Sequence, residues 1–522
     1  MNTPARDIGI KKPTAKPTET LTETIQSKLS DPASTSDFDL HGCVNEVLKN
    51  VGLTAADSGG KLSFYGQDPI IASPHRFGAM AAVTLAARSV ALASLRKSQT
   101  GEGQDIHVDV RKAFRRFCGF FEGKWETING RGPSMYADRD NPFWQIPLFR
   151  NTRDGRHVVA INIYPRLHTR ALNFLRCSDS PQSVNNAILQ WQADDLEGAA
   201  QEAGIVFAKV RTYQEFLKEP QYTEVLSKMP LITVEKIGES EPMPFKTGAK
   251  RPLEGIRALG MGHVIAGAGI GRDLAYYGAD VLNIWAPNDT EVESFFWDVQ
   301  VGMRSTILDH SKEDRAKFDR LLKDADVFFS NRRPGYLEKY GLTAEELSEK
   351  RPGLIHAKVV LHGEQGPWSN WVGFDEIGAA VAGVFANEGT PTQPSSPLII
   401  PICDNVVGWL GTVGVLEALR RRSVEGGSYR VVSSLTRTVL WLLSMGIFDK
   451  VYARETAGST DEHTNIAPDL FTAETPLGTY QGMTDQVVLS KTPGSFRTVL
   501  DPRGSSKPEW LETEASRMRP AA

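Results

Sequence analysis

The sequence predicts an α/β protein with a Rossmann-like parallel-sheet domain, a smaller α/β domain and a partial internal duplication. Strand and helix patterns alternate with short connections over residues 252–383, and a shorter α/β pattern covers residues 142–247. A helix, glycine turn and strand occur in that order twice. The 522 residues, 40% hydrophobic and 23% charged, suffice for two or three cores.

The chain divides into five predicted regions. Residues 1–36 are rich in Thr, Ser, Pro and Lys, so we expect a disordered tail. Residues 37–141 form a partial first copy of a large-domain element, residues 142–247 the small α/β domain and residues 248–440 the Rossmann-like domain. Residues 441–522 are expected to be a C-terminal return segment and tail.

The Rossmann-like region predicts a parallel sheet covered on both faces, with ligands outside the carboxyl ends of its strands. Its glycines after the first strand never complete Gly-x-Gly-x-x-Gly, and no acidic residue ends the second strand, so NAD binding is disfavoured. The predicted elements are strands Gly255–Gly260, Val281–Ile284, Val327–Phe329 and Leu354–Val360 and helices Ala266–Tyr277, Lys312–Lys323 and Ala344–Lys350.

The repeated pattern begins with a helix over residues 78–95 and occurs again from residue 406. An offset of 324 residues places Gly103 on Gly427 and Met80 opposite Asp404. This indicates an internal duplication whose first copy has lost the carboxylate. The alternative is that two amphipathic helices followed by glycine turns simply look alike.

Asp404 stands at the start of the long apolar helix of the second copy. The first N–H groups of a helix lack intrahelical partners and the peptide dipoles add, so an anion is stabilised there. We therefore expect Asp404 to be ionised and to face a substrate cavity. The competing interpretation is an ordinary helix N-cap.

Composition excludes several classes of partner. The formal charge of −4 gives no basic field for nucleic acid, so an anionic substrate must meet a local cluster of cations. The four cysteines form no Cys-x-x-Cys pair, which indicates reduced thiols, a cytoplasmic protein and no metal site. No signal core is present and the apolar runs look too short for a bilayer, so no membrane association is expected.

Several phrases in order resemble the class III CoA-transferases, the family of formyl-CoA and carnitine-CoA transferases and α-methylacyl-CoA racemases. The resemblance covers roughly residues 62–440 and implies that family's interleaved architecture. Here, however, a helix copy and the small domain precede the Rossmann-like unit, as in a divergent tandem fusion. The phrases are Pro252–Arg257, Leu274–Val281, Arg304–Asp309, Ala325–Leu337, Gly363–Pro367 and Gly373–Asp375.

The resemblance implies that Asp404 attacks an acyl-CoA carbonyl and that an aspartyl-CoA thioester then passes CoA to a carboxylic acid. The implied substrates are an acyl-CoA and a carboxylate, with coenzyme A as the carrier. His263 is expected near the adenylate or the reacting end. The implied CoA-binding residues are Arg333 and Lys339 on the phosphates, with Asn331, Arg332 and Ala266. Because family members form interlocked dimers, we expect a homodimer or an intrachain pseudo-dimer.

Some residues depart from the family pattern. Phe374 stands where racemases carry His and cannot move a proton, Ile265 replaces a Gln, and Ala286 follows the second strand where an acidic residue is common. Two alternatives therefore stay open. One is a lyase, epimerase or cyclase with Asp404 as acid or base; the other is a non-catalytic binding homologue. His263 and His362, at the carboxyl ends of predicted strands, are each a candidate general base or a solvated loop residue.

Overall fold

The computed structural model describes residues 20–117, 119–133, 142–143, 148–400 and 402–512. Its centre is a seven-stranded sheet in the order β10-β9-β8-β11-β12-β13-β7, in which only β7 is antiparallel to its neighbour. The first six strands follow the doubly wound order, with a switch point between β8 and β11. The strands are β7 (Thr233–Gly238), β8 (Arg257–Met261), β9 (Asp280–Trp285), β10 (Arg304–Ile307), β11 (Val327–Ser330), β12 (Ile355–Val360) and β13 (Ser428–Ser434).

The predicted parallel sheet is confirmed, and its sequence explains its burial. Every residue of β11 is buried, as expected for a Val- and Phe-rich strand covered on both faces. Helix α11 begins where Ser311 accepts a hydrogen bond from the Asp314 backbone N–H, a standard N-cap. The helices of this domain are α9 (Ala266–Tyr276), α10 (Glu293–Val299), α11 (Lys312–Lys323), α12 (Tyr336–Lys339), α13 (Ala344–Lys350), α14 (Asp375–Ala382), α15 (Val384–Glu388), α16 (Asp404–Glu425) and α17 (Leu435–Ser444).

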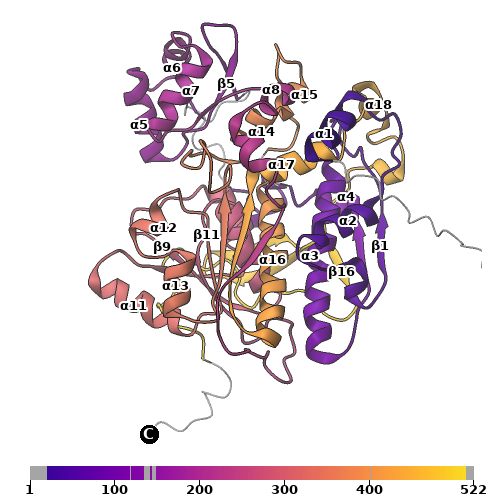
Figure 1. Cartoon of the computed structure of the whole chain (residues 1–522), viewed down its shortest axis with the longest axis vertical. Coiled ribbons are helices and arrows are strands. Elements are labelled where there is room, and N and C mark those ends of the chain that lie inside the picture. The colour runs from indigo at the N-terminus through magenta and orange to yellow at the C-terminus, as the bar shows by residue number, and fades with distance from the viewer. Residues whose placement is uncertain (1–19, 118, 134–141, 144–147, 401, 513–522) are drawn as a thin grey trace, which may run out of the picture.

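Helices α3 (Phe77–Thr100) and α16 run side by side and form the core of the molecule (Figure 1). Helix α16 also approaches α9 closely, since a Cβ on Gly408 would lie 2.9 Å from the Ala266 carbonyl oxygen. By length and composition α3 could cross a membrane, so the expectation that every apolar run is too short is wrong. In the fold, 94% of its apolar window is buried inside the protein.

The N-terminal region is more ordered than the sequence suggested. The predicted disordered tail, residues 1–36, is wrong for residues 20–30, because Leu21–Ser30 form helix α1; residues 1–19 lie outside the described part. Thr20 and Glu23 make a capping box, and Ile25 and Leu29 are buried one helical turn apart. The other first-copy elements are α2 (Leu40–Lys49), η1 (Ala55–Ser58), β1 (Leu62–Tyr65), β2 (Ile106–Asp109), α4 (Val110–Phe114), η2 (Gly119–Glu122) and β3 (Thr127–Ile128).

A small α/β unit lies beyond one end of the large sheet (Figure 1). Its antiparallel strands pair in the order β4-β5-β6. The predicted boundary at residue 247 is wrong, because residues 233–238 leave this unit and pair with β13 as strand β7. The unit comprises β4 (Phe149–Asn151), β5 (His157–Ala160), β6 (Phe207–Lys209), α5 (Pro165–Leu175), α6 (Pro181–Ile188), α7 (Ala193–Glu202), α8 (Tyr213–Phe216) and the π-helix η3 (Gln221–Leu226).

The C-terminal segment returns to the first-copy region. Strand β16 pairs with β2, and β15 pairs with β3. Arg88 on α3 joins the parts through two ion pairs of 2.6 Å, to Asp273 on α9 and to Asp485 of the returning segment. All three side chains are buried. The returning elements are α18 (Lys450–Thr456), η4 (Asp461–His463), β14 (Leu470–Thr475), β15 (Gly478–Met483) and β16 (Val487–Leu489).

Candidate functional site

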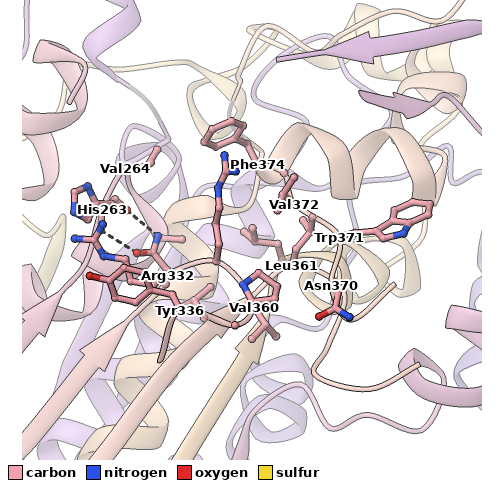
Figure 2. Close-up of a pocket in the computed structure, with 18 of the residues that line it drawn as sticks. His263, Val264, Arg332, Tyr336, Val360, Leu361, Asn370, Trp371, Val372 and Phe374 are labelled. Carbon is pink, nitrogen blue, oxygen red and sulfur yellow. Dashed lines mark hydrogen bonds between the residues drawn. The ribbon is translucent and has the colours of Figure 1, made fainter. Parts of the chain in front are cut away.

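A cavity of about 920 Å³ opens at the carboxyl ends of β8, β11 and β12, where the switch point of the sheet predicts a ligand. Its walls come from the Rossmann-like domain and from helix α5 of the small unit. Figure 2 shows His263 and Arg332 on one side of the cavity and Asn370 and Trp371 on the other. The site is therefore built between two domains of one chain.

Asp404 lines this cavity as the first residue of α16 and is 5% exposed. Burial raises its pKa well above the usual range, and the neighbouring Asp375 and Glu376 raise it further. The expectation that the helix N-terminus keeps Asp404 ionised is therefore wrong for the unliganded protein.

The physical reason lies with Asp375, the first residue of α14. Its Oδ2 accepts hydrogen bonds from the backbone N–H groups of Cys403 and Asp404, the latter at 3.0 Å, so the amides at the start of α16 are already occupied. Burial and Asp375 raise the pKa of Glu376 to about 8. Because three carboxylates share one region, they cannot all be charged near neutral pH, and the amide donors favour the charge on Asp375.

His263 follows β8 and lies among charged partners. Its Nε2 is 3.0 Å from Asp289 Oδ2, and Arg332 Nη2 donates to the same oxygen at 2.8 Å. Burial and Arg332 lower the pKa of His263, although Asp289 opposes them. We conclude that His263 is neutral at physiological pH and that Arg332 is held by Asp289.

Asn331 and Ala266 also line the cavity. Both ends of the Asn331 amide are used on one residue: Oδ1 accepts from the His263 N–H at 2.9 Å and Nδ2 donates to the His263 carbonyl at 2.8 Å. Asn331 therefore fixes the loop after β8 against the loop after β11. Ala266, at the start of α9, contributes a small buried surface.

Arg333 and Lys339 separate in the structure. Arg333 lines the cavity and donates to the Gly204 carbonyl at 3.3 Å. Lys339 does not line the cavity; it ends α12, is exposed and lies over the Tyr340 ring. The structure thus does not bring Lys339 to the cavity, where the CoA phosphates were expected.

Tyr164 was not found from the sequence. It lines the cavity from the small unit, stacks on Phe374 with ring centroids 5.8 Å apart, and donates to Glu291 at 2.6 Å. Glu291 also accepts from the N–H of Val264, a β-branched residue with φ of 56°. Such a backbone is strained, and strain of this kind clusters at functional sites.

Arg166 and Arg170 were also missed. They lie four residues apart on α5 and line the cavity from the small unit. Their spacing, which places two cations on one helix face, was the available signal.

Two other candidates are poor reactive groups. Burial raises the pKa of the Cys403 thiol well above its usual value. Burial lowers the pKa of His362 to about 3, and its Nδ1 lies 2.8 Å from the Thr436 hydroxyl. Among the described residues no group of three or more His, Cys, Asp or Glu side chains could hold a metal ion.

Comparison with known families matches residues 253–492 to CoA-transferase family III. The acetyl-coenzyme A transferase nodX of Hypoxylon pulicicidum is 32% identical over 38% of this chain and 35% of its own length. The succinyl-CoA–D-citramalate CoA-transferase of Chloroflexus aurantiacus is 32% identical over 37% of this chain and 51% of its own.

A solved structure of Rv3272 from Mycobacterium tuberculosis is 30% identical, with a TM-score of 0.34, over 37% of this chain and 57% of that one. The chain spans about half or less of the length of these relatives. Residues 253–492 are thus similar to CoA-transferase family III, and each of the two named transferases is similar to less than two fifths of the chain.

Proposed function

We propose that the protein transfers coenzyme A between an acyl-CoA and a carboxylic acid, with Asp404 as the nucleophile. The observation that carries the proposal is Asp404 at the wall of a two-domain cavity of about 920 Å³. Its side chain has no hydrogen-bond donor among the described residues, so its oxygens are free for substrate. Both named relatives are CoA-transferases, which supports the same class of reaction.

The proposed exchange proceeds through three covalent intermediates. Asp404, in the fraction of molecules in which it has lost its proton, attacks the thioester carbonyl; the CoA thiolate leaves, and a mixed anhydride forms. The thiolate then attacks the Asp404 carbonyl, the first acid leaves, and an aspartyl-CoA thioester remains. The acceptor carboxylate attacks that thioester, the CoA thiolate leaves again, and a second mixed anhydride forms. The thiolate then attacks the acceptor's carbonyl in this anhydride, which gives the new acyl-CoA and regenerates Asp404. Covalent catalysis divides one hard exchange into easier steps.

The raised pKa of Asp404 favours a second candidate. A carboxyl group whose pKa is raised by burial and by Asp375 can hold a proton for general acid or base catalysis. A lyase, epimerase or cyclase could use it without a covalent intermediate. Phe374 provides no second proton-transfer group opposite it, so the transferase remains the leading proposal.

Trapping the intermediate distinguishes these candidates. The protein is incubated with acetyl-CoA, quenched with hydroxylamine, and digested for mass spectrometry. The transferase should yield a hydroxamate on Asp404, 15 Da heavier than the acid, with none in Asp404→Asn. Turnover of acetyl-CoA without any hydroxamate would favour acid–base chemistry instead.

We further propose that the chain acts as an intrachain pseudo-dimer. The cavity takes residues 164–170 from the small unit and the remainder from residue 263 onward, so one chain supplies both walls. Specific activity should then be independent of protein concentration while light scattering gives the 57.4 kDa monomer mass. Activity that falls on dilution together with the mass would favour a homodimer.

A further inference from the structure

Three arginines stand at the part of the cavity where the small unit meets the Rossmann-like domain. Arg166 and Arg170 come from α5, and Arg333 follows β11. No carboxylate of the described residues lies within 4.0 Å of any of these three guanidinium groups. Each is exposed, so each can reach a ligand in the cavity.

The other cations of the cavity are neutralised. Arg332 is paired with Asp289 at 2.8 Å, and Lys358 lies 3.2 Å from Glu364. Of the other acids that line the cavity, Glu338 lies 4.0 Å from Lys358, and burial favours the neutral form of Asp404. The three arginines therefore give this cavity a local positive potential in a protein whose formal charge is −4.

Arg170 and Arg333 are also held near one another. Arg170 Nη2 donates to the Ala203 carbonyl at 2.5 Å, and Arg333 Nη1 donates to the next carbonyl, Gly204, at 3.3 Å. Arg333 keeps exposed surface, but desolvation of its guanidinium group by the surrounding cavity wall and the charge of Arg170 lower its pKa. Two like charges anchored on adjacent carbonyls repel each other, and an oxyanion between them would relieve that repulsion.

We propose that Arg170 and Arg333, with Arg166 beside them, form an interdomain clamp for an oxyanion. Its ligand is a phosphate group of CoA or the carboxylate of the acceptor acid, and these two sources rest on the proposed function. Guanidinium groups suit both because they offer paired donors in a planar fork. Since the clamp joins α5 to the loop after β11, bound anion draws the small unit onto the Rossmann-like domain.

The test uses isothermal titration calorimetry on the full chain with four probes: CoA, dephospho-CoA, inorganic pyrophosphate and succinate. The variants are Arg170→Gln, Arg170→Lys and Arg166→Gln. The matched control is Arg153→Gln, an exposed arginine of the small unit that does not line the cavity. Thermal unfolding of each variant shows that the fold is retained.

We expect Arg170→Gln to raise the dissociation constant of the bound anion about tenfold. Arg170→Lys should raise it less, and the control should leave it unchanged. If the arginine variants bind only CoA more weakly, the clamp holds the 3′-phosphate. If they bind CoA, dephospho-CoA and pyrophosphate more weakly, it holds the diphosphate. If they bind only succinate more weakly, it holds the acceptor carboxylate.

The clamp is overturned if Arg170→Gln and Arg166→Gln match the Arg153→Gln control with every probe. Failure of the proposed function would look different. Wild-type protein would then bind no CoA and form no hydroxamate, while titrations with pyrophosphate and succinate would still test the clamp.

Discussion

The N-termini of α3 and α16 are built alike but end in different surroundings. Each is capped by a buried aspartate from another segment. Asp68 accepts from the N–H groups of Gly78 and Ala79 at 3.0 and 2.7 Å, and Asp375 accepts from those of Cys403 and Asp404. The shared cap fits the predicted duplication, which stays a prediction.

One residue in the first turn of each helix decides what the helix start can do. Met80 is fully buried, while Asp404 borders the cavity. Before α3, His75 lies 2.8 Å from Glu388 and Arg76 lies over Phe448, so packed side chains fill the region. A capped helix N-terminus alone therefore has only a structural role. A reactive site also requires a carboxylate and a cavity beside it.

The largest expected effect comes from removing the carboxyl group at residue 404, with or without placing one at residue 80. Asp404→Asn should lower the rate of CoA transfer at least about 1000-fold, because an amide cannot form the anhydride. Adding Met80→Asp should restore nothing, since that position has no cavity. Initial rates with acetyl-CoA measure both variants, and more than a tenth of wild-type activity in Asp404→Asn would refute the nucleophile.

A second contrast lies halfway along α3. Arg88→Met should lower the free energy of unfolding by about 3–5 kcal/mol, because it removes the ion-pair partner of the buried Asp273 and leaves the buried Asp485 paired with Arg272 alone. Lys97→Met, at an exposed position of the same helix, should change it by less than about 0.5 kcal/mol. Urea unfolding measures both, and equal values for the two variants would remove the buried network as a source of stability.

The two capping aspartates should have similar effects on stability but different effects on the pH–rate profile. Asp68→Asn and Asp375→Asn should each cost about 1–2 kcal/mol of unfolding free energy, the range for losing a helix cap. Only Asp375→Asn should move the pH–rate profile, toward lower pH, because removing its charge lowers the pKa of Asp404. Denaturation and pH–rate curves test the pair; an equal shift in both variants would contradict the asymmetry.

The smallest effect is expected from Glu376→Gln, which should shift the pH–rate midpoint downward by up to about one unit, since a neutral neighbour eases ionisation of Asp404. Folding raises the pKa of Glu376 from 4.5 to about 8. A raised pKa stabilises the fold at low pH, so wild-type stability should fall between those two values. The variant should lose less over that window in thermal unfolding, and an unchanged slope would disprove it.

Sequence patterns predicted what depends on neighbours along the chain. Period and turn residues gave the helices and strands of the Rossmann-like domain, and the family resemblance singled out Asp404 and Arg333. Helix α1 was missed although Thr20, Glu23, Ile25 and Leu29 carry its pattern, because the flanking composition suggested disorder.

The remainder depended on contacts between distant segments. Tyr164 meets Glu291 across 127 residues, and the cap from Asp375 reaches Asp404 across 29. No local pattern reports that a carboxylate will have two acidic neighbours, so the charge state of Asp404 was predicted wrongly. Lys339 was expected at the phosphates from its place after the motif, but sequence position alone does not report which residues of a short helix line a cavity.

The ion pair between Arg88 and Asp485 spans 397 residues, which has a consequence for biosynthesis. At about 5–20 residues per second, a ribosome needs roughly 20–80 s after making Arg88 to supply its second acidic partner. Throughout that interval the apolar surface of α3 lacks part of its final covering. We therefore expect nascent chains halted before Asp485 to recruit chaperones and to be cut readily by proteases.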